Sequence, residues 1–589
     1  MKKSLIKSFA ASTAVLSLVA SLSPFALDHV AAQEDAKIFD SKVENKGDAI
    51  EGGDLKYAVM SGSTFAGVFN SMFYSDSTDS QVISMFNPGI IGYNENFEVD
   101  SSGFADIDID QDNKQVTITI PKDQKWDDGE PITIDDVIFP YYVIGHKDYA
   151  GIRYGADYEN VEGMEEYHNG ESEEISGLER VDDYTLTVHY KEFSPSMLQA
   201  GGGISAYMEP EHIFKDIEVK DMEDSEPVRK MPVGFGPFKV ESITPGEAVK
   251  FVRNDNYYKD LAAVDSVTME IVNPSTIVAE LKAGHYDVAS LPSDQYETFK
   301  DAKNFKTLGV LANTYTYIAF KFGTWDDEKG EIKMDDSKIV NNKALRQAMA
   351  YAIDNAAVTQ EFYQGIRIAA NSHITPNFKD YNNPDQKGYE FNPDKAKQLL
   401  ADAGFKDTNN DGFVEDPNGN EFTLHFASMS GGETAEPLAQ YYIQSWQQVG
   451  IHVELTDGKL MEMNSFYDRI QNDDENIDIY QAAMGVGGDP NPRGLWGRSE
   501  PFNYARWGSG ENDKFLEQMS SPEAFDAKAR QKMYYDWQKY MMEEIPSIPT
   551  MFRQELTAVN NRVSNWDITI GNDLEWSQVK LLADSPIAE

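Results

Sequence analysis

The chain contains no cysteine, so disulfides, thiolate metal sites and cysteine nucleophiles are all excluded. Basic residues are scarce: 51 Lys and Arg stand against 99 Asp and Glu in 589 residues, a formal net charge of −48. Phosphates would be repelled by such a chain, and the charge therefore argues against nucleic acid as a partner and against adsorption to an anionic membrane. A hydrophobic content of 41 % is nevertheless ample for a buried core.

Only the start of the chain carries a long apolar run. Lys2, Lys3 and Lys7 precede a mostly apolar stretch over residues 6–22, and small residues follow at 30–33. This order predicts a signal peptide over residues 1–32 rather than a membrane anchor, because Ser and Thr dilute the apolar stretch. Polar residues 33–53 then predict a flexible leader, and the remaining chain is expected to work outside the cytoplasm.

Catalytic motifs are missing as well. The nine histidines are dispersed, and the chain has no H-E-x-x-H, no G-x-S-x-G and no G-x-x-x-x-G-K-[ST]. A Ser-His-Asp triad or a pair of catalytic carboxylates can also assemble from distant positions, without a local motif. A secreted hydrolase is therefore kept as an alternative. We expect no cofactor and no enzymatic activity.

One loop resembles a calcium ligand set. Asp407, Asn409 and Asp411 occupy positions 1, 3 and 5 of an EF-hand-like loop, with Gly412 at position 6. Position 12 is Asn418 instead of the bidentate Glu, and the segment joins a helix to a strand. An Asx turn between the two elements is therefore the preferred interpretation, and no metal site is predicted.

The residue pattern is typical of a mixed α/β fold with two different halves. Alternating apolar residues at 116–120 and 184–190 predict strands in the first half. Asn392-Pro393 predicts a helix start, and the order of strand 422–426, helix 438–449 and strand 451–455 predicts a β-α-β unit. Two such lobes predict a ligand cleft between them.

Four stretches resemble one family, the extracytoplasmic oligopeptide-binding proteins of ABC importers, within the peptide- and nickel-binding solute-binding proteins. The stretches contain the patterns W-D-D-G with D-D-V, G-F-G-P-F with R-N-D-N-Y-Y, L-K-A-G-H-Y-D-V, and N-K-A-L-R-Q-A-M-A-Y; they lie at residues 116–137, 234–258, 281–288 and 342–354. They follow the family's order, and residues 458–465 resemble the branch found in Gram-positive bacteria.

The resemblance implies a two-lobed, periplasmic-binding-protein-like fold. Lobe I is expected to comprise residues 54–287 and 546–589, with a subdomain inserted at about 95–175. Lobe II is expected at residues 288–545. In the family, the lobes close over the ligand by hinge motion.

The resemblance also implies how a peptide is held. An aspartate after a backbone-pairing segment takes the α-ammonium of the peptide, and Asp489 after Val486, Gly487 and Gly488 matches it. Asp-Pro-Asn-Pro replaces the family's usual spacing here, so Asp489 could instead cap a turn, which leaves Asp478 as the fallback. Aromatic residues on the strand entering the second half complete the candidate site, with a polar neighbour: Tyr315, Tyr317 and Asn313.

The favoured hypothesis is a monomeric solute-binding subunit that captures oligopeptides and delivers them to the permease subunits of an ABC transporter. The same fold leaves dipeptides, signalling peptides or a metal chelate as alternative ligands. Gram-positive members are usually lipoproteins, but this chain has no lipobox cysteine. Retention at the cell surface or in the periplasm is then expected to depend on the transporter.

Overall fold

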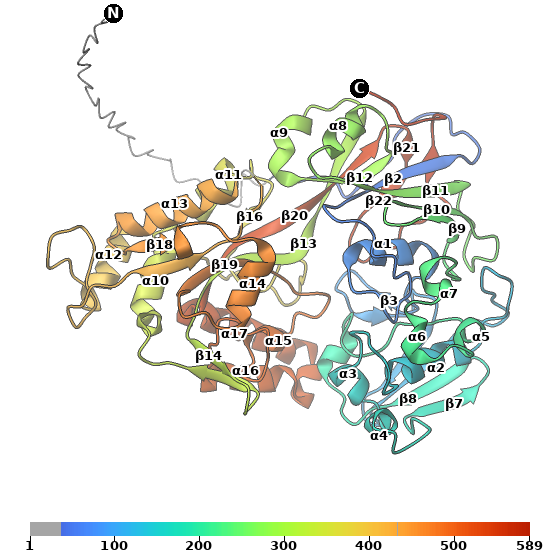
Figure 1. Cartoon of the computed structure of the whole chain (residues 1–589), viewed down its shortest axis with the longest axis horizontal. Coiled ribbons are helices and arrows are strands. Elements are labelled where there is room, and N and C mark those ends of the chain that lie inside the picture. Colours follow the sequence, from blue (N-terminus) through green and yellow to red (C-terminus); the bar gives the residue numbers. More distant parts are fainter. Residues whose placement is uncertain (1–36, 433) are drawn as a thin grey trace, which may run out of the picture.

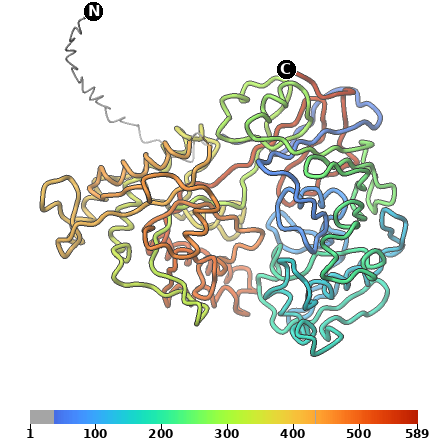
Figure 2. The backbone as a smooth tube through the Cα atoms, in the orientation of Figure 1, coloured from blue at the N-terminus to red at the C-terminus, as the bar shows by residue number. Residues whose placement is uncertain are grey.

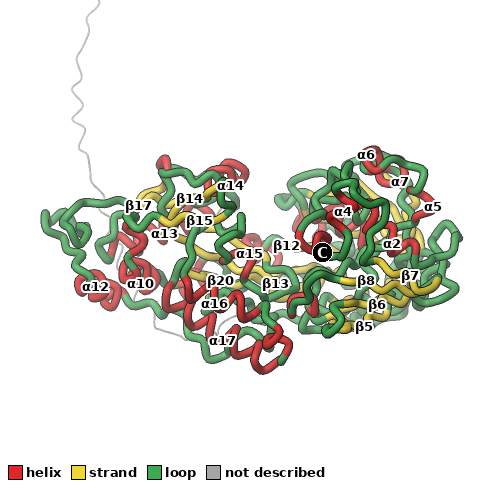
Figure 3. Tube along the Cα trace, turned by 90° about the horizontal axis from the view of Figure 1, so that it is seen from below, coloured by secondary structure: helices red, strands yellow, loops and turns green. Residues whose placement is uncertain are grey.

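The structure, a computed structural model, describes residues 37–432 and 434–589. Two lobes lie side by side and are joined by long strands near one end (Figure 1), and the chain passes between them more than once (Figure 2). Helices dominate lobe II, whereas four strands form a separate group in lobe I (Figure 3). The predicted two-lobed α/β fold is confirmed. The predicted signal peptide, residues 1–32, lies outside the described residues.

One mixed sheet runs through both lobes, in the order β18-β17-β19-β13-β20-β12-β2-β11-β10-β9. Its lobe I part, with the helices beside it, consists of β2 (Asp54–Met60), β9 (Phe238–Thr244), β10 (Ala248–Arg253), β11 (Ser266–Val272), β12 (Val288–Leu291), α1 (Ser77–Phe86), α8 (Ile277–Lys282) and α9 (Tyr296–Phe299). Strand β2 pairs in parallel with β11 and β12, and β12 pairs antiparallel with β20 (Ser547–Asn560). The C-terminal strands β21 (Val563–Ser564), β22 (Trp566–Asp567) and β23 (Lys580–Leu581) complete this lobe.

The inserted subdomain has a sheet and a core of its own. Its elements are β3 (Gly92–Tyr93), β4 (Val99–Asp100), β5 (Asp106–Asp110), β6 (Gln115–Thr119), α2 (Asp135–Ile144), α3 (Ala156–Glu159), α4 (Met164–His168), β7 (Leu178–Asp182), β8 (Thr185–His189), η1 (Pro195–Leu198), α5 (Glu211–Phe214), α6 (Val219–Met222) and α7 (Glu226–Arg229). Strands β6 and β8 are the two strands predicted from alternation, and they pair antiparallel. The core cluster that includes this sheet runs from Val68 to Phe235. The predicted limits of the insert, about 95–175, stay a prediction.

Lobe II packs helices around the other end of the large sheet. Its elements are β14 (Gly323–Asp326), β15 (Glu331–Met334), α10 (Lys343–Tyr351), α11 (Asn355–Glu361), β16 (Ile368–Ala369), α12 (Pro393–Asp402), β17 (Leu424–Ala427), α13 (Ala435–Gln448), β18 (Val453–Leu455), α14 (Met463–Gln471), β19 (Ile479–Gly485), α15 (Arg493–Trp496), α16 (Gly510–Met519), η5 (Pro522–Phe525) and α17 (Ala527–Glu544). The predicted β-α-β unit is confirmed, because β17 and β18 pair in parallel with α13 between them. The predicted cap is also present: the Asn392 side chain accepts the N–H of Lys395 at 3.0 Å.

Two long strands, β13 (Phe305–Phe320) and β20, cross from one lobe to the other. Their antiparallel pairing is regular from Phe305 to Leu311, shifts between Leu311 and Tyr315, and then continues. Such an interruption in register is where a paired ribbon bends most easily. Residues 288–291 and 305–311 pair with residues 554–560 of β20. The predicted boundary between residues 287 and 288 stays a prediction.

The motifs behind the family resemblance are structural in lobe I. Trp126 is fully buried and packs against Phe235, with ring centroids 5.9 Å apart. A Cβ at Gly234 would lie 2.0 Å from the Phe86 carbonyl oxygen, so only glycine fits there. The carboxylate that ends the third stretch, Asp287, forms a buried ion pair at 2.6 Å with Arg562, which fastens the C-terminal segment to the sheet.

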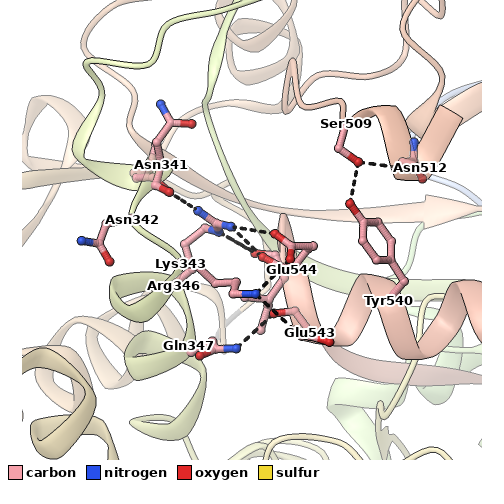
Figure 4. Close-up of polar contacts among 12 residues, drawn as sticks. Asn341, Asn342, Lys343, Arg346, Gln347, Ser509, Asn512, Tyr540, Glu543 and Glu544 are labelled. Carbon is pink, nitrogen blue, oxygen red and sulfur yellow. Dashed lines mark hydrogen bonds and ion pairs between the residues drawn. The ribbon is translucent and has the colours of Figure 1, made fainter. Parts of the chain in front are cut away.

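The fourth stretch holds the end of the longest helix of lobe II. The Arg346 guanidinium donates to the carbonyl oxygen of Glu544, the last residue of α17, at 2.7 Å and to that of Ile545, directly after it, at 3.1 Å (Figure 4). It also donates to Val340 and Asn341 at 2.7 and 2.9 Å. These contacts satisfy carbonyl groups that a helix leaves unpaired at its C-terminus.

The described part of the predicted leader, residues 37–53, is not free. Strand β1 (Lys42–Val43) pairs antiparallel with β22, and the Lys37 N–H donates to the Gly365 carbonyl at 2.9 Å. The described residues of this segment therefore have defined partners in the fold, and the predicted flexibility of the leader stays a prediction. Phe39, Val43 and Ile50 of the segment also pack against apolar clusters of lobe I.

Candidate functional site

A cavity of about 240 Å³ lies between the end of β19, the segment that follows it, and the stretch after β16. Its walls come from three parts of lobe II: Tyr315 on β13, the stretch around His373, and the segment that follows β19. The described lining residues are Tyr315, His373, Ile374, Phe378, Gly485, Val486, Asp489, Pro490, Asn491, Pro492, Gly494, Leu495 and Trp496. Apolar and aromatic groups therefore dominate a cavity with one carboxylate.

Two glycines, Gly487 and Gly488, allow the loop after β19 to turn toward lobe I. Gly487 has φ +59°, a left-handed conformation that glycine adopts without strain. Gly488 comes so close to lobe I that an added Cβ would lie 2.5 Å from the Ala200 Cβ. The two glycines thus bring the loop, with Asp489 at its end, against the opposite lobe.

Asp489 is half-buried and forms a turn with the residues that follow it. Its Oδ1 accepts the N–H of Asn491 at 2.9 Å, and the Asn491 amide donates to Ser196 Oγ of η1 at 3.2 Å. Burial raises the pKa of Asp489, and hydrogen bonds to its carboxylate from the Asn491 N–H and from Ser196, together with the charge of Arg530, oppose this rise. The turn-capping interpretation and a ligand role are compatible, because the turn uses one of the two carboxylate oxygens.

The predicted tyrosines have different positions. Tyr315 and Tyr317 are both buried, but only Tyr315 lines the cavity. Tyr317 packs against Tyr480, with ring centroids 6.0 Å apart, in the lobe II core. Burial raises the pKa of both phenols, so they stay protonated.

His373 lies deep in the cavity wall and is neutral. It is 2 % exposed, and its Nε2 shares a hydrogen bond of 2.8 Å with Ser547 Oγ. Burial without a charged partner lowers the pKa of His373 to about 3. Trp496 contacts it edge to face at 5.5 Å. Asp489 is therefore the single charged group among the described residues that line the cavity.

The lobes touch beside this cavity. Arg530 of α17 is buried, lies 3.6 Å from Glu98 of lobe I and is stacked over Tyr381 at 5.1 Å. Farther out, Lys379 of lobe II pairs with Glu95 at 2.6 Å. Cations on lobe II thus face carboxylates on the inserted subdomain, which favours contact between the lobes.

Other candidate residues lie away from the cavity. Asp478, at the start of β19, accepts the N–H of His425 at 2.8 Å and does not line the cavity. Asp407 accepts the N–H groups of Asn410 at 2.7 Å and Gly412 at 3.0 Å, so its oxygens close a turn. No group of three or more metal-ligating acidic or histidine residues is present within residues 37–432 and 434–589.

Sequence reasoning missed the second wall of the cavity. His373, Ile374 and Phe378 lie in a segment without helical or strand periodicity, so no pattern in the sequence pointed to it. Arg530 was missed because a single arginine in an amphipathic helix looks like an ordinary surface residue. In the folded chain Arg530 is buried, with Tyr381 of lobe II and Glu98 of lobe I beside it.

Comparison with known proteins identifies the family of this chain. Residues 101–505 match the model of the bacterial extracellular solute-binding proteins, family 5 (middle region). The chain belongs to this family. Family 5 relatives include the oligopeptide-binding protein OppA of Lactococcus lactis subsp. lactis, 32 % identical over 521 residues, covering 86 % of this chain and 87 % of the relative. The oligopeptide-binding protein AppA of Bacillus subtilis is 27 % identical over 514 residues, with 86 % and 87 % coverage.

A solved family 5 structure agrees with the architecture. Lactococcal OppA, complexed with an endogenous peptide in the closed conformation, superposes with a TM-score of 0.77 at 31 % identity. The match covers 90 % of this chain and all of that one. Within the described part of this family 5 chain, no helix is both long enough and apolar enough to cross a bilayer.

Proposed function

We propose that this chain is the extracytoplasmic solute-binding subunit of an ABC importer, capturing oligopeptides between its lobes and delivering them to the permease. Two relatives that each match 86 % of this chain are named oligopeptide-binding proteins, which supports this ligand class. The arrangement of two lobes in contact beside a cavity suits a protein that encloses its ligand. We further propose that it acts as a monomer, outside the cytoplasm, held near the membrane by its transporter.

The observation that carries the proposal is the single carboxylate in a cavity whose other described lining residues are uncharged. Asp489 would pair with the α-ammonium of a bound peptide, and this cation would offset the burial that raises the pKa of Asp489. Backbone groups of Val486, Gly487 and Gly488 would pair with the peptide main chain. Tyr315 would contact its side chains.

Binding without cleavage is part of the proposal. The cavity combines one carboxylate with a histidine that stays neutral. The hydroxyl that shares a hydrogen bond with this histidine, Ser547 Oγ, belongs to a fully buried residue that does not line the cavity. General acid–base hydrolysis would need a second titratable group positioned on the ligand. We therefore propose that the chain releases its peptide intact and that the ATPase of the transporter supplies the chemistry.

Calorimetric titration with defined peptides, followed by mass spectrometry of the bound ligand, tests this function. We expect intact peptide, bound with one-to-one stoichiometry. Recovery of cleaved fragments would favour the secreted hydrolase, and binding of only dipeptides or a metal chelate would redirect the ligand class.

The site is tested by Asp489→Asn. We expect at least tenfold weaker binding of a peptide with a free amino terminus, equal to about 1.4 kcal/mol. Asp478→Asn is the matched control, because Asp478 directly precedes β19, is bonded to His425 and lies outside the cavity lining. Equal affinities for both variants would move the ammonium contact elsewhere.

A further inference from the structure

Asn313 occupies the point where the lobe-crossing strand leaves lobe I. It lies in the interruption between Leu311 and Tyr315, where β13 has no regular partner on β20. On the other side, Thr314 already pairs with Gly485 of β19. One residue thus stands at the junction of the crossing strand and the loop that carries Asp489.

The backbone and side chain of Asn313 both hold that loop. Its carbonyl oxygen accepts the N–H of Val486 at 2.9 Å, and its Nδ2 donates to the Gly487 carbonyl at 2.6 Å. On its other face, Oδ1 accepts from Asn377 Nδ2 at 2.8 Å. Asn377 also donates to the Leu311 carbonyl at 2.6 Å. The amide therefore links both cavity walls to the crossing strand.

We infer that Asn313 is a positioning residue that sets the place of Asp489, and not a ligand contact as its sequence position suggested. This inference rests on the proposed function. Asn313 is absent from the cavity lining, and both ends of its amide are engaged within the protein. It acts on the ligand only through the main chain of residues 486–489.

The loop has a second support that exists only when the lobes touch. Gly488 packs on Ala200, and Asn491 donates to Ser196, both in lobe I. When the lobes separate, these two contacts are lost and the hydrogen bonds of Asn313 remain. Asn313 thereby keeps the carboxylate in its binding position before closure, which lowers the ordering cost of capture.

The test compares one peptide with a free amino terminus and the same peptide with an N-acetyl group. We measure both affinities by calorimetry for the unaltered chain and for Asn313→Ala. We expect the free-amine peptide to lose tenfold or more, while the acetylated peptide changes less than twofold. The ratio of the two affinities should therefore fall toward one, a change that general loosening of the fold does not produce.

Asn382→Ala is the matched control, because Asn382 Nδ2 donates to the Ile374 carbonyl at 2.7 Å on the opposite wall only. It should leave the ratio unchanged. Asn377→Ala removes the donor to Leu311 and one donor to Asn313 Oδ1, while the donor Thr375 Oγ1 remains at 3.4 Å. It should therefore lower the ratio by a smaller factor than Asn313→Ala. This second variant keeps the test decisive if Asn313→Ala folds poorly.

An unchanged ratio in both Asn313→Ala and Asn377→Ala would overturn the inference while leaving the proposed function intact. A ratio lowered equally by Asn382→Ala would overturn it as well, since the effect would then not be specific to this loop. If the unaltered chain binds both peptides equally, the role proposed for Asp489 fails, and the inference fails with it.

Discussion

Replacing Gly488 by alanine should oppose contact between the lobes. A Cβ at this position would lie 2.5 Å from the Ala200 Cβ and 2.9 Å from the Ala200 carbonyl oxygen. Carbon atoms in contact normally stay about 3.5–4.0 Å apart. The lobes would therefore have to separate by roughly 1 Å along this contact, or the loop would have to move away from Asn313.

The expected cost follows from overpacking a contact that cannot adapt locally. Inserting one methyl group into a tight site costs about 1–3 kcal/mol, because backbone has to shift. The penalty applies to the closed state only, so it reduces ligand affinity by about 5- to 150-fold and leaves the stability of each lobe nearly unchanged. Gly488 has no positive φ, so backbone strain adds nothing to this figure.

The assay is peptide affinity by calorimetry, combined with the radius of gyration by X-ray scattering with and without peptide. Gly487→Ala is the control: its φ of +59° strains the backbone, but its Cβ would meet no described atom within 4 Å outside its chain neighbours. Ala200→Gly in the Gly488→Ala background should recover part of the affinity. Undiminished affinity in Gly488→Ala, or no recovery in the double variant, would refute the reasoning.

Three further predictions concern stability and are checked by denaturant unfolding or thermal melting. Burial lowers the pKa of His373 to about 3, so between pH 6.5 and about 3 the unfolded chain binds this proton and the folded chain does not. The free energy of unfolding of lobe II should therefore fall by about 1.4 kcal/mol per pH unit as the pH is lowered through this window. His373→Gln should remove this contribution to the slope. Arg562→Met leaves the Asp287 carboxylate buried without its partner and should cost about 3–5 kcal/mol, whereas a loss below 1 kcal/mol would contradict a buried pair. Arg346→Met removes charged donors from carbonyls beyond α17 and should cost at least about 1.5–3 kcal/mol, seen as a lower melting temperature.

Local elements could be predicted from the sequence because their causes are local. The cap at Asn392, the strands around 116–120 and 184–190, and the β-α-β unit each depend on residue spacing within one turn or one strand. The loop after β19 could also be predicted, since two adjacent glycines before an aspartate indicate that the backbone lies close to another part of the protein. Its partners on lobe I could not.

The unpredicted parts depend on residues far apart in the chain. Ser196 and Asn491 meet across 295 positions, and Glu98 reaches Arg530 from the other lobe. The residue pattern within each of these segments does not predict such a contact between the lobes. The same reason applies to the inserted subdomain. Its core contains Val68 and Phe235, which lie outside residues 95–175 and join the core only through packing in the folded chain.

The residues that reveal the family therefore do not line the cavity that we propose holds the ligand. Trp126, Gly234, Asp287 and Arg346 hold lobes and helix ends together, and none of them lines the cavity. Folding constrains them whatever the ligand is, so relatives with different ligands can share them. The cavity walls at 373–378 and 485–496 carry no such motif. Peptide preference should therefore follow substitutions in these two segments, while changes at the four motif residues should alter stability first.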